Sequence, residues 1–143
     1  MRWENIANIF RSADHDIKDE VKEIEPRPLT DREAGWIREI LQTNDEWKHA
    51  DISRTQVVAE GPCDEGLSIL LQAPEPENPK ASPVGGYIGR LWINNNDNSV
   101  IEVRLTHLDR RLRELFILFV DPKHPRRTLP ESWIEVSHEA LKM

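Results

Sequence analysis

The stretch that decides the fold is residues 100–120, which read VIEVRLTHLDRRLRELFILFV. In its first half, apolar side chains occupy every second position, at Ile101, Val103 and Leu105. Successive side chains of a β-strand point to opposite faces of a sheet, so this half predicts a strand that is buried on one face only. The second half predicts the partner strand of a hairpin that turns at residues 108–111.

The second strand of this hairpin, residues 112–120, is apolar on both faces. Its run from Leu115 to Val120 contains no polar side chain, so each face needs a cover of its own. We expect a helix to cover one face, and the N-terminal segment or a second copy of the chain to cover the other. Phe116 and Leu118 are therefore candidate interaction residues, and we predict a homodimer.

The same period of two recurs along the chain after residue 53. Short polar or glycine-containing links separate these runs, as they do between antiparallel strands. We therefore expect an α+β fold in which N-terminal helices are followed by a mostly antiparallel β-meander of about five strands. The runs with strand character are residues 55–60, 67–73, 86–93, 100–107, 112–120 and 133–137.

Helices are expected before residue 53. The sequence Thr30-Asp31-Arg32-Glu33 has the form of a capping box, which predicts a helix from Asp31 to about Gln42. Further upstream, apolar residues recur at helical spacing and predict a helix over residues 3–24, or two shorter helices broken near residue 13. These apolar residues are Trp3, Ile6, Phe10, Ala13, Ile17, Val21 and Ile24, and we take Trp3 and Phe10 as interaction candidates.

The chain then divides into an N-terminal helical segment, residues 1–25, and a single domain, residues 26–143. Residues 74–84 contain four prolines and no apolar periodicity, so we expect a flexible loop between two strands. Residues 121–131 have a similar composition and predict a second such loop.

Composition restricts the class of protein. The 143 residues include 19 Lys and Arg against 26 Asp and Glu, for a net charge of −7, which makes nucleic acid an unlikely partner because such binding depends on neutralising phosphates. No apolar run is long enough to span a membrane and the first residues lack a signal-peptide pattern, so we expect a cytoplasmic protein that does not bind membranes. Cys63 is the only cysteine, which excludes an internal disulfide.

Charge is distributed unevenly along the chain. Residues 14–25 carry six acidic and two basic side chains, whereas residues 104–127 carry seven basic and three acidic ones. Opposite charges at two ends of a small chain can guide docking onto a partner or onto a second copy. Within the basic segment, we take Arg110, Arg111 and Arg113 as interaction candidates.

Three segments resemble a family of small uncharacterised bacterial α+β proteins. They are Arg27–Glu33, Gly61–Ser68 and the hairpin from Ile101–Leu105 to Leu112–Ile117, and the likeness covers roughly residues 27–120. The resemblance implies the α+β fold and a bacterial source. Because the family has no established activity, it implies no catalytic residue.

A few side chains could take part in catalysis. Cys63 is followed by two acidic residues that would raise the pKa of its thiol, so we interpret it as a turn residue and not as a nucleophile. His107 and Asp109 lie two positions apart, a spacing that would suit an acid–base pair at a hairpin end if the strand ran through both residues.

The sequence therefore favours a non-enzymatic protein-interaction module, of which an immunity-like protein that neutralises a bacterial toxin is one form. Its partner would be another protein or a second copy of the chain. The alternative is an enzyme or small-ligand-binding protein with a polar site near His107 and Asp109. We assign no catalytic, cofactor-binding or metal-binding residue.

Overall fold

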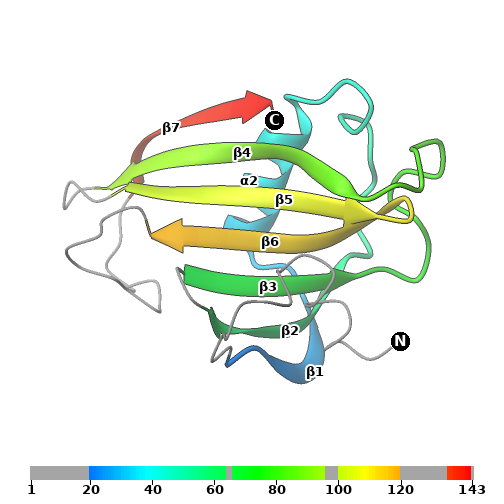
Figure 1. Cartoon of the computed structure of the whole chain (residues 1–143), viewed down its shortest axis with the longest axis horizontal. Coiled ribbons are helices and arrows are strands. Elements are labelled where there is room, and N and C mark those ends of the chain that lie inside the picture. The colour runs from blue at the N-terminus through cyan, green and yellow to red at the C-terminus, as the bar shows by residue number, and fades with distance from the viewer. Residues whose placement is uncertain (1–19, 64–65, 96–99, 120–134, 143) are drawn as a thin grey trace.

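The computed structural model describes residues 20–63, 66–95, 100–119 and 135–142, and within them lie one α-helix and seven β-strands (Figure 1). The α+β class predicted from the sequence is confirmed. In chain order the elements are β1 (Lys22–Pro28), α2 (Asp31–Leu41), β2 (Gln56–Cys63), β3 (Gly66–Gln72), β4 (Gly86–Asn95), β5 (Val100–Leu108), β6 (Arg111–Phe119) and β7 (Glu135–Lys142).

The seven strands form one sheet in the order β1-β2-β3-β6-β5-β4-β7, and each pairing among them is antiparallel. Strands that follow one another in the chain pair in β1–β2, β2–β3, β4–β5 and β5–β6, which confirms the expected meander for most of the sheet. The order departs from a simple meander at two places, because β6 returns to lie beside β3 and β7 returns to lie beside β4.

The prediction of a helix that continues to residue 24 is wrong, because residues 22–28 form strand β1. Pro26 and Pro28 lack the N–H groups that a helix needs, whereas an edge strand tolerates proline. Pairing with β2, interrupted by a register shift between Glu23 and Arg27, therefore outweighs the helical spacing of Val21 and Ile24. The earlier part of the predicted helix, including Trp3 and Phe10, lies outside the described residues.

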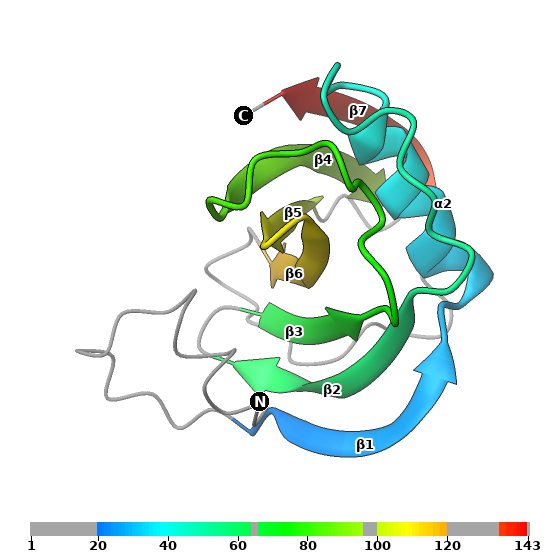
Figure 2. The same cartoon turned by 90° about the vertical axis from the view of Figure 1, so that its right-hand side faces the viewer.

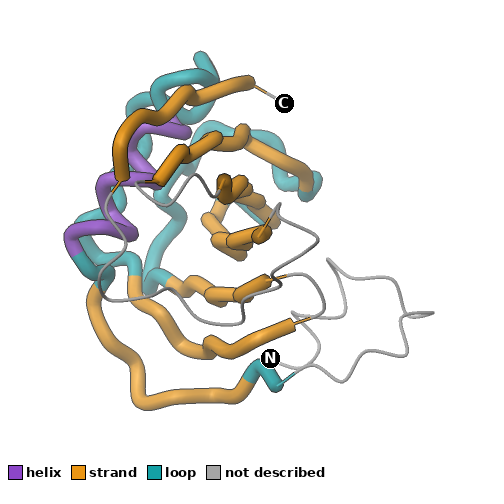
Figure 3. Tube along the Cα trace, turned by 90° about the vertical axis from the view of Figure 1, so that its left-hand side faces the viewer, coloured by secondary structure: helices purple, strands orange, loops and turns teal. Residues whose placement is uncertain are grey.

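The sheet curves around α2, with β1 and β7 at the two ends of the arc and the helix on the concave side (Figures 2 and 3). Trp36, Ile37 and Ile40 of α2 are buried against this side of the sheet, in the same cluster as Leu115 and Ile117 of β6. Leu115 and Ile117 of β6 thus face the same core as the helix, while the strands that α2 contacts most are β4, β5 and β7. The main hydrophobic core lies between α2 and the concave face.

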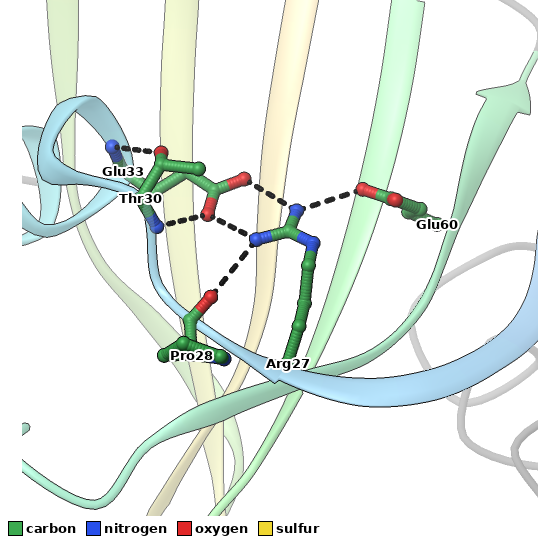
Figure 4. Close-up of polar contacts among 5 residues, drawn as sticks. All are labelled: Arg27, Pro28, Thr30, Glu33 and Glu60. Atoms are coloured by element: carbon green, nitrogen blue, oxygen red, sulfur yellow. Dashed lines mark hydrogen bonds and ion pairs between the residues drawn. The ribbon is translucent and has the colours of Figure 1, made fainter.

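The capping box predicted at the start of α2 is present and belongs to a larger network (Figure 4). The Glu33 N–H donates to Thr30 Oγ1 at 3.1 Å, and the Thr30 N–H donates to Glu33 Oε1 at 2.9 Å. Arg27 of β1 donates from Nη1 and Nη2 to the two oxygens of Glu33, each at 2.9 Å, and its Nη2 also donates to Glu60 of β2 at 2.9 Å. One arginine thus joins β1, α2 and β2.

Residues 74–84, expected to form a flexible loop, contain no helix or strand but are anchored to the rest of the domain. The Asp51 N–H donates to the Glu77 carbonyl at 3.1 Å, and the Asp109 N–H donates to the Pro83 carbonyl at 3.0 Å. These bonds satisfy backbone groups that a proline-rich composition leaves without regular partners. We therefore expect the segment to move less than its composition predicts.

The network around Glu33 should make stability depend on pH. Burial alone would raise the pKa of Glu33, but the hydrogen bonds from Arg27 and Thr30 outweigh burial and lower it. A lowered pKa in the folded state contributes stability above about pH 4.5, the ordinary value for Glu, and this contribution is lost as the pH falls through the folded-state pKa. Glu33→Gln should therefore lower the free energy of unfolding by about 1–3 kcal/mol at pH 7 and by much less at pH 3.

Urea unfolding followed by circular dichroism at both pH values measures this difference. Glu25→Gln is the matched control, because Glu25 lies on the same edge strand and is exposed. A penalty for Glu33→Gln that is equal at both pH values would contradict an ionic role for the network.

Candidate interaction face

The structure places Cys63 and His107 at opposite ends of the sheet. His107 pairs in register with Leu112 of β6, whereas Cys63 pairs with Gly66, which in turn pairs with Leu118 of β6. Leu112 and Leu118 are six residues apart on β6, which corresponds to roughly 20 Å at about 3.3 Å per residue. The two side chains therefore form no nucleophile–base pair.

His107 and Asp109 both lie at the β5–β6 hairpin end but have separate surroundings. The imidazole ring of His107 packs against Trp47, with 5.0 Å between ring centroids, and burial lowers its pKa. Asp109 and Arg110 have φ angles of 55° and 66°, the left-handed values that a tight hairpin turn requires, and Asp109 pairs with Arg111 at 3.8 Å. The described residues contain no cluster of three or more His, Cys, Asp or Glu side chains that could hold a metal ion.

A buried carboxylate near this end, Glu77, was missed by the sequence analysis. Thr55 Oγ1 donates to Glu77 Oε2 at 2.7 Å, and the Leu112 N–H donates to Glu77 Oε1 at 3.2 Å. Burial raises the pKa of Glu77 despite these two bonds. The carboxylate fastens the proline-rich segment to β6, which gives it a structural role.

The three arginines predicted as interaction candidates at this end all contact their own chain. Arg110 Nε donates to the Ala81 carbonyl at 3.0 Å, and Arg111 forms the ion pair with Asp109 described above. Arg113 is buried, which lowers its pKa, and its Nη2 donates to the Leu108 carbonyl at 3.5 Å. Because these arginines are already bonded within the chain, they are less available to bind a partner than the basic segment of the sequence predicts.

A different group of charged and aromatic residues lies on the convex side of the sheet, opposite α2. Register sets them next to one another, because Arg90 pairs with Arg104 and Trp92 pairs with Glu102. Arg104 in turn pairs with Phe116 of β6. We call this group the outer face and define it as Tyr87, Arg90, Trp92, Glu102, Arg104, Phe116 and Leu118.

The centre of the outer face is a carboxylate held by two guanidinium groups. Arg104 donates from Nε to Glu102 Oε1 at 3.1 Å and from Nη2 to Oε2 at 3.3 Å, while Arg90 Nη1 donates to Oε1 at 3.3 Å. The hydrogen bonds with Glu102 raise the pKa of Arg104. We call Arg90, Glu102 and Arg104 the trio. Because one negative charge faces two positive charges, the trio retains a net charge of about +1.

Aromatic rings hold both guanidinium groups in place. The Arg90 Cζ atom lies 5.8 Å from the ring centroid of Trp92, and the Arg104 Cζ atom lies 5.9 Å from that of Tyr87. Both distances fall within the range of cation–π attraction. The Glu102 side chain is only 6% exposed, but those of Arg90 and Arg104 are 35% and 30% exposed and Tyr87 is 49% exposed.

The outer face continues into an apolar area on β6. Phe116 packs against a small buried cluster that contains Val21, Ala59, Cys63 and Leu70, and Leu118 is half-buried. Cys63 is thus a buried packing residue at the end of β2. Of the five interaction candidates that lie among the described residues, Phe116 and Leu118 are on the outer face.

Comparison of the chain with protein-family models, curated proteins and solved structures finds no match. The resemblance to a bacterial family noted from the sequence therefore stays a prediction. Among the described residues, no helix combines the length and apolar character needed to cross a membrane.

The two hydrogen bonds of Glu77 lead to a stability prediction. Glu77→Ala leaves the buried Leu112 N–H and Thr55 hydroxyl without their partner, which should lower the free energy of unfolding by about 1–3 kcal/mol. In Glu77→Gln the amide oxygen can accept from Leu112 while the amide nitrogen donates to the Thr55 hydroxyl, so stability at pH 7 should change by less than about 1 kcal/mol.

Urea unfolding of both variants checks this pair of expectations. If Glu77→Gln were as damaging as Glu77→Ala, the negative charge of Glu77, and not its hydrogen bonding, would be what the fold needs.

Proposed function

We propose that the protein is a non-enzymatic protein-interaction module and that the outer face is its contact surface. The observation that carries this proposal is the pair of partly exposed arginines, Arg90 and Arg104, each stacked on an aromatic ring around the buried Glu102.

The residue types on this face suit a protein contact. Tryptophan, tyrosine and arginine are enriched among the few residues that dominate binding at protein interfaces, and at the outer face they adjoin the apolar side chains of Phe116 and Leu118. The ion pairs and ring contacts hold the long arginine side chains before a partner arrives, which reduces the entropy lost on binding. A toxin-neutralising, immunity-like role is one form of this function.

The proposal is tested by finding the partner and then measuring its affinity. Tagged protein is recovered from the source cells, enriched proteins are identified by mass spectrometry, and the best candidate is purified for calorimetry. Trp92→Ala should weaken its binding at least tenfold, because the variant removes a large contact ring and the support for Arg90. Trp36→Phe, in helix α2 on the concave side of the sheet, is the aromatic control and should leave the affinity unchanged.

Melting temperatures show whether each variant is folded. A candidate that binds wild type and Trp92→Ala equally well, with both proteins folded, would mean that the outer face is not the contact surface.

The homodimer predicted from the sequence is an alternative, in which the partner is a second copy of the chain. Light scattering should then give a mass near twice 16.7 kDa that falls as salt increases, because salt screens the attraction between acidic and basic segments. A mass of one chain at every protein concentration would contradict the dimer and leave a different protein as the partner.

A further inference from the structure

Arg90 is the outer-face residue whose bonding capacity is least used. A guanidinium group has five N–H donors, and the contacts among the described residues give Arg90 one hydrogen bond, from Nη1 to Glu102. Its Nε is buried without a hydrogen-bond partner, whereas Arg104 makes two bonds to the same carboxylate. The surplus positive charge of the trio is therefore concentrated at Arg90.

Arg90 is also presented to the outside in a fixed orientation. Its side chain lies on a strand in the interior of the sheet, is bonded to Glu102 on one side and rests on the Trp92 ring. The exposed third of the side chain leaves room for a further contact. A planar guanidinium group held in this way matches a carboxylate, which can accept two parallel N–H bonds.

From this geometry we infer that the outer face binds a partner protein through an acidic segment, with a carboxylate of that segment bonded to Arg90. This inference rests on the proposed function and specifies the chemistry of the partner. Tyr87 and Phe116 would contact apolar side chains that flank the carboxylate.

A second copy of the chain fits this surface poorly. The outer face is convex (Figure 2), so two such faces would touch only along their middle strands. A two-fold dimer built on it would also bring like charges together, because each copy presents the same two arginines. A different protein with a carboxylate-bearing segment avoids both problems.

Single-stranded nucleic acid fits less well than an acidic peptide. Such binding combines many phosphate contacts with bases stacked on free aromatic rings. Here Trp92 and Tyr87 already carry arginines, and the chain has a net charge of −7, which repels a long polyanion. A peptide with a few carboxylates meets less of this repulsion.

The test uses a defined probe and the full chain. A short synthetic peptide with two Glu residues, each flanked by Leu, is titrated into ¹⁵N-labelled protein, and the side-chain Nε–H signals of arginine are followed by NMR. The Arg90 signal, assigned from its absence in Arg90→Lys, should shift on binding. The same peptide with Gln in place of Glu should bind at least tenfold more weakly, and salt should weaken the binding of the Glu peptide.

Two variants separate the geometry of Arg90 from its charge. Arg90→Gln should weaken binding of the Glu peptide about tenfold, and Arg90→Lys should weaken it by a smaller factor because the charge remains without the planar group. Arg38→Gln, at an exposed position of α2, removes the same charge elsewhere and should have no effect.

The inference is overturned if the Glu and Gln peptides bind equally, if Arg90→Gln leaves binding of the Glu peptide unchanged, or if an oligonucleotide of equal charge binds more tightly. The comparison between peptides uses wild-type protein, so it holds even if a variant is unstable. If the peptide test fails while Trp92→Ala still weakens the natural partner, the inference fails alone. If both tests fail, the proposed function fails with it.

Discussion

Burial of the apolar side of α2 in the concave face of the sheet is the constraint on which the rest of the structure depends. Ile37 and Ile40 are fully buried there, together with Leu115 and Ile117 of β6. A sheet can bury one face against a helix and leave the other face free for polar residues. Because the concave face supplies most of the core, the outer face is free to carry charged side chains.

Local signals in the sequence predicted most of this fold. The capping box predicted that the helix starts at Asp31. The alternation from residue 100 predicted both the strand and the side of the sheet on which each of its residues lies. The same alternation placed Glu102 and Arg104 on the face away from the core. It did not reveal the trio, because Arg90 joins it from β4 and the pairing of β4 with β5 depends on the register of a separate hairpin.

The predictions from sequence failed where contacts between residues far apart in the chain outweighed the local pattern of apolar and polar residues. Val21 and Ile24 have helical spacing, yet pairing with β2 draws the residues that follow Val21 into a strand. Glu77 lies in a proline-rich segment that lacks any periodicity, and only its bonds to Thr55 and Leu112 explain why a carboxylate is buried there. Neither partner is within twenty residues of Glu77 in the chain, so no local reading of the sequence could identify them.

The trio at the centre of the outer face is poorly explained as a device for stability. Moving a carboxylate and two guanidinium groups partly out of water carries a desolvation penalty that ion pairing often only balances, and apolar side chains in such positions can be equally stable. The larger core lies on the concave side, and none of Arg90, Glu102 and Arg104 belongs to it. Holding two partly exposed guanidinium groups in a fixed orientation does not raise the free energy of unfolding. It does favour binding of an anionic group. This difference is why we propose that the outer face is the contact surface of the protein.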